Sequence, residues 1–192
     1  MKFITSHISI MVLISFLAFL RLYLTYAGCV CTTVPCPVEG NNTIVMGNGF
    51  ALIDYIYENH RDYEVVVSAS GTITVGSLDH GTDTTSCTQQ YSRMLEDDGE
   101  QDCDAGHILA NRLGGYGNQP INIFPQNMTV NRGEYAQFEG DIYDCMKNGG
   151  GVGHLSWDFY YDDCGRTMPS SVEYVAVFED GDCGTIRSLF PN

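Results

Sequence analysis

The residues best suited to chemistry lie in three segments between positions 104 and 139. The first is Asp104-Ala-Gly-His107, the second is Asn122-Ile-Phe-Pro-Gln-Asn127, and the third begins at Asn131 and carries Glu139 eight positions later. Residues eight apart lie about 80° from each other around a helix, so Asn131 and Glu139 can border one face. Imidazole exchanges a proton near neutral pH, and amide and carboxylate oxygens suit a hard cation. The three segments together predict a site at which a histidine, an amide and a carboxylate converge on one ion.

Each of these residues also has an ordinary structural explanation. Asn131 precedes Glu134 by three positions, as in a helix N-cap. His107 taken alone suits a hydrogen-bonded core histidine, and Glu139 suits a helix position that faces water. The joint pattern, and no single residue, favours chemistry.

A helix from Asn131 to Lys147 is expected to carry two of the candidate residues. Apolar residues recur there at helical spacing and form one stripe, made of Tyr135, Phe138, Ile142 and Cys145 or Met146. Lys147 and the Asn-Gly-Gly-Gly after it are typical of a helix end. The stripe would turn one face of this helix toward a core.

The rest of the chain predicts an α+β domain, with an antiparallel sheet and flanking helices. Helical spacing of apolar residues predicts a short amphipathic helix over 50–57. Two segments rich in β-branched residues, 64–70 and 71–77, predict a hairpin that turns at Ser70-Gly71. Further strands are expected at Val172 to Phe178 and, with a weaker pattern, at Trp157 to Tyr161. No regular β-α-β alternation is present, which favours α+β over α/β.

The three chemical segments resemble the signature of the DNA/RNA non-specific endonucleases. That signature is similar to D-R-G-H, then N-x-x-P-Q, then N-x-G-x-W with an acidic residue eight positions after its Asn. The matching residues here are Asp104 to His107, Asn122 to Gln126, and Asn131 with Gly133, Tyr135 and Glu139. Two positions depart from it, since Ala105 replaces Arg, as in a bacterial branch of the family, and Tyr135 replaces Trp. The resemblance implies a ββα-metal, or His-Me finger, active site.

The resemblance also implies a role for each residue. His107 would be the general base, and Asn131 the direct protein ligand of a single Mg²⁺, with Mn²⁺ and Ca²⁺ as alternatives. Glu139 would hold metal-bound waters, while Asp104 and Asn122 would organise the base and the metal loop. Candidates for phosphate binding are Arg112 and Arg132, both of which also suit a solvent-exposed position. The products would be DNA or RNA fragments with 5′-phosphate ends.

The chain is strongly acidic, which limits how it can hold a nucleic acid. It has 24 acidic and 9 basic side chains among 192 residues, and a formal net charge of −15. This charge disfavours a protein that binds DNA or RNA through a broad basic surface. We therefore expect few phosphate contacts, weak binding and a shallow dependence on salt.

Residues 1–27 predict an export signal, and residues 28–192 a single nuclease-like domain. Lys2 supplies a positive start, residues 8–20 carry no charge, and Thr25-Tyr26-Ala27 resembles a signal-peptidase site. The uncharged run is too short to span a bilayer, although an uncleaved anchor that uses residues 22–27 as well is an alternative. We expect a secreted protein with no stable membrane association after cleavage.

Eight cysteines remain after position 27, and an oxidising compartment would let them form disulfides. Their connectivity stays open, and the spacing at Cys29, Cys31 and Cys36 does not suit a zinc site.

Asn41 and Asn127 begin glycosylation sequons. Six acidic residues between Glu96 and Asp104 do not fit an EF-hand loop, so a solvated acidic loop is expected.

A second class of function is compatible with the same features. A secreted, disulfide-rich binding module could retain a nuclease-like fold without catalysis. The presence of both His107 and Asn131 favours the enzyme. The sequence does not indicate an oligomeric state.

Overall fold

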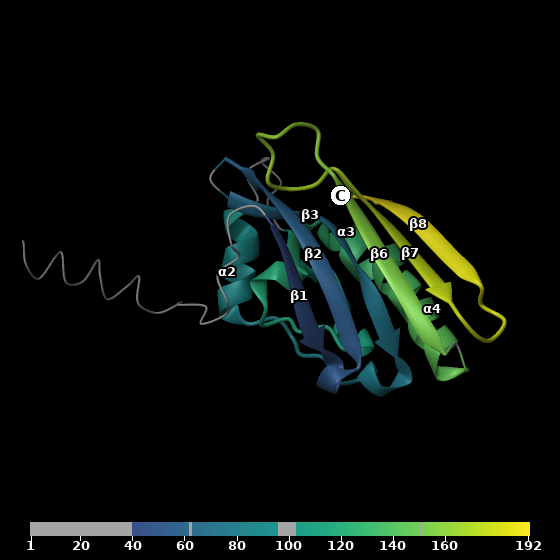
Figure 1. The fold of residues 1–192 in the computed structure, drawn as a ribbon. Coiled ribbons are helices and arrows are strands. Elements are labelled where there is room, and N and C mark those ends of the chain that lie inside the picture. Colours follow the sequence, from purple (N-terminus) through teal and green to yellow (C-terminus); the bar gives the residue numbers. More distant parts are fainter. Residues whose placement is uncertain (1–39, 62, 96–102, 150) are drawn as a thin grey trace, which may run out of the picture. The chain divides into compact units, whose positions relative to one another are not determined.

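A six-stranded antiparallel sheet forms the framework of the protein (Figure 1). The computed structural model describes residues 40–61, 63–95, 103–149 and 151–192, which belong to one compact unit spanning Thr33–Asn192. The strands in spatial order are β1 (Gly40–Met46), β2 (Ala51–His60), β3 (Tyr63–Thr74), β6 (Val152–Tyr160), β7 (Ser171–Phe178) and β8 (Thr185–Pro191). The α+β class is confirmed, as are the strands expected around Trp157 and Val172. The expected export signal and acidic loop lie in residues 1–39 and 96–102, outside the described part of the chain.

Strand β2 occupies the segment that the sequence analysis assigned to a helix, so that prediction is wrong. Its side chains alternate between buried and exposed along most of the strand, with Ile53 and Tyr55 fully buried and Leu52 and Ile56 about half exposed. The strand pairs with β1 on one side and β3 on the other. The apolar residues at helical spacing therefore lie on both faces of a strand, because the outer sheet face also carries apolar side chains.

Strand β3 is continuous through the predicted turn at Ser70-Gly71, so the predicted hairpin is also wrong. Gly71 pairs with Ile53 of β2 and Leu155 of β6, in the middle of the sheet. A Cβ atom at Gly71 would lie 2.0 Å from the carbonyl oxygen of Leu52. The glycine thus permits a close approach of two strands, and the hairpin turn lies instead between His60 and Tyr63.

The helices are α2 (Ser86–Met94), α3 (Met128–Val130), the π-helical turn η5 (Asn131–Tyr135) and α4 (Ala136–Lys147), with short 3₁₀ turns η1 (Gly47–Gly49), η2 (Val75–Ser77), η3 (Asn111–Leu113) and η4 (Pro120–Asn122). Helix α4 packs against the large sheet, and α2 packs against the strands β4 (Asp104–His107) and β5 (Ile123–Gln126). Figure 1 shows α3 and α4 behind the sheet. None of the helices in the described ranges is long and apolar enough to cross a membrane.

The predicted apolar stripe of the helix is buried against the sheet. Tyr135 and Ile142 are fully buried, and the Tyr135 ring contacts Tyr174 of β7 with centroids 5.8 Å apart. Tyr174 in turn packs on Trp157 of β6 at 4.6 Å. Burial of Ile142 contributes about 2 kcal/mol to folding. This packing fixes the helix that follows the second candidate segment.

A second, two-stranded sheet completes the unit that the family resemblance implied. Strand β4 (Asp104–His107) pairs antiparallel with β5 (Ile123–Gln126), which places Asp104 opposite Gln126 and His107 opposite Ile123. The chain continues from β5 directly into α3, η5 and α4. The predicted ββα arrangement is therefore present, with Asp104 and His107 on its first strand.

A disulfide between Cys145 of α4 and Cys183 ties the helix to the chain segment between β7 and β8. The two cysteines are 38 positions apart, so in the chain-entropy account the cross-link contributes about 4 kcal/mol. We expect the variant with both cysteines changed to serine to lose about 2 to 4 kcal/mol of unfolding free energy in urea titrations. Cys164→Ser is the matched control, because Cys164 is exposed and forms no disulfide among the described residues. Unfolding of the double variant at the urea concentration of the parent would contradict the estimate.

Candidate active site

A cavity of about 450 Å³ lies beside strand β4. Three residues singled out from the sequence line it, namely Asp104, His107 and Asn131. The opposite wall contains Thr84 and two residues of α2, Gln89 and Arg93. The structure therefore brings the histidine and the amide of the predicted site to one cavity, although 24 positions separate them in the chain.

The surroundings of His107 determine which of its ring nitrogens can accept a proton. Its Nε2 atom lies 3.1 Å from the carbonyl oxygen of Thr82. A carbonyl oxygen only accepts hydrogen bonds, so Nε2 carries the proton and Nδ1 of the neutral ring keeps its lone pair. Burial lowers the pKa of His107 below 6.5, and the bond to Thr82 and the charge of Asp83 offset only part of that shift. His107 is therefore a neutral base at neutral pH.

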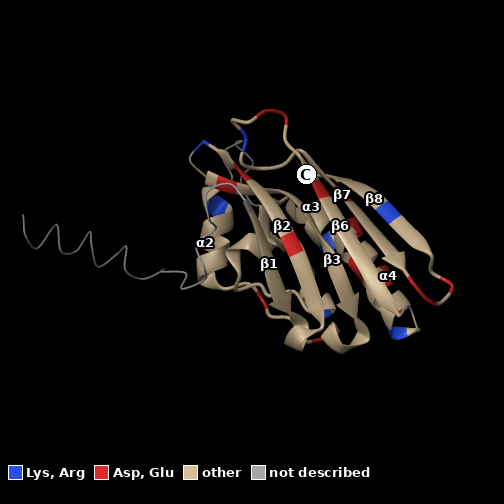
Figure 2. Cartoon of the chain, viewed as in Figure 1, with Lys and Arg blue, Asp and Glu red and all other residues tan. Residues whose placement is uncertain are grey.

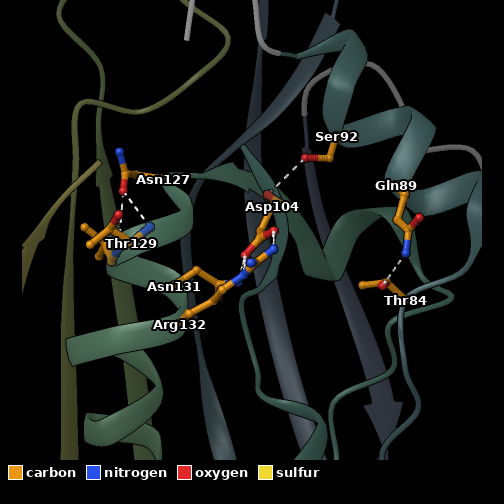
Figure 3. Close-up of polar contacts among 9 residues, drawn as sticks. Thr84, Gln89, Ser92, Asp104, Asn127, Thr129, Asn131 and Arg132 are labelled. Carbon is orange, nitrogen blue, oxygen red and sulfur yellow. Dashed lines mark hydrogen bonds and ion pairs between the residues drawn. The ribbon is translucent and has the colours of Figure 1, made fainter. Parts of the chain in front are cut away.

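Asp104 orients the amide of Asn131. The Nδ2 atom of Asn131 donates to Oδ2 of Asp104 at 2.9 Å (Figure 3). An ionised carboxylate only accepts, so the amide nitrogen must face it and Oδ1, which can accept a hydrogen bond or coordinate a cation, points away from the carboxylate. Burial raises the pKa of Asp104, but hydrogen bonds from Arg132 and Asn131 and the charge of Arg132 outweigh it and hold the pKa below its ordinary value. Asp104 thus stays ionised in its orienting role.

Arg132, a predicted phosphate-binding residue, is paired with the same carboxylate. Its Nε and Nη2 atoms donate to the two oxygens of Asp104 at 2.8 and 2.7 Å. The side chain is 64% exposed, and this pair uses two of the five N–H donors of the guanidinium. Arg132 therefore neutralises the charge of Asp104, and only the other three N–H groups of its guanidinium remain for a phosphate.

The helix that carries Asn131 starts earlier than the sequence suggested. Asn127 is its N-cap, because its Oδ1 accepts from the backbone N–H groups of Thr129 and Val130 at 2.9 and 3.2 Å. Asn131 lies one turn later, where its backbone N–H donates to the carbonyl oxygen of Asn127 at 2.9 Å. The N-cap explanation of Asn131 is therefore wrong, and its side chain is free to face the cavity.

The side chain of Asn192 secures the junction between β5 and this helix. Its Oδ1 accepts from the backbone N–H of Asn127 at 2.8 Å, and its Nδ2 donates to the carbonyl oxygens of Pro125 and Pro169 at 2.9 and 3.0 Å. These bonds hold the N-cap against the end of the sheet. Asn192 thereby helps to set the position of Asn131.

Asn122 is a scaffold residue with no exposed surface. Its Oδ1 accepts from the Tyr55 hydroxyl and the Leu109 backbone N–H, both at 2.8 Å. Its Nδ2 donates to the carbonyl oxygens of Leu109 and Tyr116 at 3.0 and 3.4 Å. Since Leu109 lies two residues after His107, these bonds fix the path of the chain beyond the histidine. The geometry is compatible with the organising role expected for Asn122 and gives it no access to the cavity.

Glu139 and Arg112 lie together on another part of the ββα unit. Burial raises the pKa of Glu139 to about 8, and the nearby charge of Arg112 opposes this shift. A Cβ atom at Gly140, the next residue of α4, would lie 3.2 Å from Nη1 of Arg112. Neither side chain is among the described residues that line the cavity. Arg112 thus lies near enough to Glu139 to affect its pKa, and it is not among the residues that line the cavity with His107.

The raised pKa of Glu139 has a consequence for stability. The folded protein keeps the proton up to about pH 8, whereas the unfolded chain releases it near the ordinary value of 4.5. The folded state binds more protons in this window, so the unfolding free energy of the metal-free parent should fall as pH rises through it. Glu139→Gln should remove this component of the pH dependence.

Urea unfolding between pH 5 and 8, in EDTA, measures the difference. The matched control is Glu134→Gln, which changes an exposed glutamate five positions earlier. Parallel pH dependence of Glu139→Gln and the parent would contradict the raised pKa.

Three residues at the site were missed by sequence reasoning, namely Thr82, Arg93 and Asn192. Thr82 acts through a backbone carbonyl, which has no sequence signature. Asn192 is 61 positions from Asn131, and the sheet places it against Asn127 at the start of the helix. Arg93 did leave a signal, because Gln89 and Arg93 are four apart and share one face of a helix.

The sequence of this chain is similar to those of known nucleases. The sequence pattern of the family described as DNA/RNA non-specific endonuclease matches residues 53–153, which is more than half of the chain. A curated relative from Dickeya dadantii (strain 3937), the probable deoxyribonuclease RhsA, is 32% identical over 169 residues. That alignment covers 84% of this chain but only 11% of the relative.

Two solved structures share the fold. NucA from Streptococcus agalactiae, with a magnesium ion bound, superposes with a TM-score of 0.51 over 80% of this chain and 84% of NucA, at 13% identity. EndoG in its complex with EndoGI gives a TM-score of 0.51 over 81% of this chain and 75% of EndoG, at 15% identity. With the sequence match and the ββα unit, these comparisons establish that the chain belongs to the DNA/RNA non-specific endonuclease family.

Proposed function

We propose that this protein is a metal-dependent nuclease that hydrolyses phosphodiester bonds of DNA, RNA or both with little sequence preference. One observation carries the proposal. A neutral imidazole with a free Nδ1 and an amide with a free Oδ1 line the same cavity, each held in its orientation by a separate protein group. Membership of the endonuclease family and the likeness to a curated deoxyribonuclease support it.

The donor set of the cavity fits a hydrated Mg²⁺. This cation prefers oxygen ligands and keeps several of its waters, so one amide oxygen can suffice as the direct protein ligand. Asn131 offers that oxygen, and Asp104 fixes the amide. When bound, the cation supplies positive charge that offsets the negative charge growing on the phosphoryl and leaving oxygens.

The protein's own residues then perform the proton transfer. His107 takes a proton from the attacking water at Nδ1, while the Thr82 carbonyl holds the Nε2 proton and stabilises the resulting imidazolium. Asp104 keeps the Asn131 amide and the Arg132 guanidinium in place. The role of Glu139 in holding metal-bound waters stays a prediction, as does phosphate binding by Arg112.

We also propose that the protein is secreted. The segment 1–27 has the charge, length and end of an export signal. The Cys145–Cys183 disulfide suits an oxidising compartment. Glycosylation of Asn41 and Asn127 would follow from this route and stays a prediction.

A gel assay on plasmid DNA and on RNA tests the proposed activity. We expect cleavage of at least one substrate with Mg²⁺ and none with EDTA. Absence of cleavage with Mg²⁺, Mn²⁺ and Ca²⁺ alike would contradict the proposal and favour the alternative of a secreted, disulfide-rich binding module without catalysis.

A further inference from the structure

The α2 wall of the cavity carries polar side chains that the proposed chemistry does not use. Gln89 and Arg93 are four residues apart and lie on one side of α2, and both line the cavity. Gln89 donates through Nε2 to the Thr84 hydroxyl at 3.2 Å. Figure 3 shows Gln89 and Thr84 on the opposite side of Asp104 from Asn131. The cavity thus has a second polar wall that faces the metal-binding side.

Hydrogen bonds fix helix α2 to β4, to β3 and to the segment between η3 and η4. The Ser92 hydroxyl donates to the Asp104 carbonyl oxygen at 3.4 Å. The Thr88 hydroxyl is 2.7 Å from the carbonyl oxygen of Gly117, and Tyr91 donates to the carbonyl oxygen of Glu64 at 3.1 Å. These contacts hold α2 in place beside β4. A side chain on this helix therefore has a defined position relative to the candidate catalytic residues.

Arg93 is the only lysine or arginine among the described residues that line the cavity. It is exposed and makes no ion pair with another residue of the described ranges, whereas Arg132 at the opposite edge is bound by both oxygens of Asp104. Asp83 and Asp104 contribute negative charge to the lining. Figure 2 shows one basic segment on α2, on a protein with many more acidic than basic residues. An anion that enters the cavity therefore meets an unpaired positive charge on the α2 side.

We propose that Arg93, with Gln89 beside it, binds a backbone phosphate next to the scissile one. The nucleic acid would then cross the cavity from the Asn131 side to α2. This inference rests on the proposed nuclease function and adds a substrate-binding subsite to it. A guanidinium suits this task because its donors match two phosphate oxygens at once.

The test compares two substrates and two arginine variants. One substrate is a single-stranded oligonucleotide, and the other is bis(p-nitrophenyl) phosphate, which contains one phosphate only. Arg93→Gln should lower kcat/KM on the oligonucleotide about tenfold more than on the small diester, the loss expected for one charged hydrogen bond. Arg93→Lys should recover part of it. Arg187→Gln is the matched control, because Arg187 lies on β8, paired with Glu173, and is not among the cavity residues.

A binding measurement separates this inference from the proposed activity. Fluorescence anisotropy with the same oligonucleotide, in EDTA, reports the Kd without turnover. We expect Arg93→Gln to raise the Kd about fivefold to tenfold and to reduce the slope of log Kd against log salt by about 0.7. If the parent cleaves neither substrate but Arg93→Gln still weakens binding, the nuclease proposal fails and the subsite stands. Equal weakening by Arg93→Gln and Arg187→Gln, or equal loss on both substrates, would overturn the subsite.

Discussion

Replacing His107 by alanine should lower kcat by about a thousandfold while metal binding stays intact. The variant loses the nitrogen that we propose as the acceptor of the proton of the attacking water. The proposed cation ligand Asn131 and its partner Asp104 make no contact with the imidazole among the described hydrogen bonds, so cation binding should persist. Because burial lowers the pKa of His107, the activity of the parent should decline with falling pH only below 6.5.

Single-turnover kinetics and calorimetric titration with Mn²⁺ measure the two properties separately. Added imidazole should restore part of the activity of His107→Ala, because the cavity leaves room for it. His154→Ala is the matched control, since His154 lies on β6 in an ion pair with Glu179. Activity of His107→Ala within tenfold of the parent would refute the role of this residue as base.

Replacing Asn131 by alanine should raise the Mg²⁺ concentration for half-maximal activity by about 100-fold or more. Loss of partners that merely orient a ligand costs 10-fold to 100-fold in metal affinity, and loss of the ligand itself should cost at least as much. The change removes Oδ1, the oxygen that the bond from Nδ2 to Asp104 leaves available. Asp104→Asn should give a smaller shift, because it disturbs the orientation of the amide and leaves its oxygen.

Activity as a function of Mg²⁺ concentration gives these values, and Mn²⁺ titration gives the affinity directly. Asn148→Ala provides the control, because Asn148 is an exposed asparagine at the end of α4. An unchanged Mg²⁺ requirement in Asn131→Ala would remove Asn131 from the metal site.

The sequence predicted the helix around Ile142 correctly because its buried face is apolar and its exposed face is polar. Tyr135 and Ile142 form part of the buried stripe, and polar residues fill the other side. The helix predicted around Leu52 and Ile56 was wrong, because these apolar residues lie half exposed on the outer face of the sheet. The hairpin turn predicted at Gly71 was also wrong, because glycine is favoured both in turns and where two strands approach closely.

The candidate site was predictable where the chemistry resides in a side chain with a recognisable spacing. His107 and Asn131 met this condition, and the structure places both at one cavity. The contacts of the Thr82 carbonyl with His107 and of the Asn192 side chain with Asn127 were not predictable, because only tertiary folding brings these residues to the site. The spacing of eight between Asn131 and Glu139 was informative about the family but did not reveal that Arg112 lies near Glu139.

The proposed catalysis requires a divalent cation that binds at the Asn131 amide within reach of the His107 imidazole. Paramagnetic broadening by Mn²⁺ in the NMR spectrum of the histidine side chains measures this proximity directly. We predict that substoichiometric Mn²⁺ broadens the His107 ring signals and spares those of His154, and that Asn131→Ala abolishes the effect. Broadening that spares His107, or that persists unchanged in Asn131→Ala, would contradict the account.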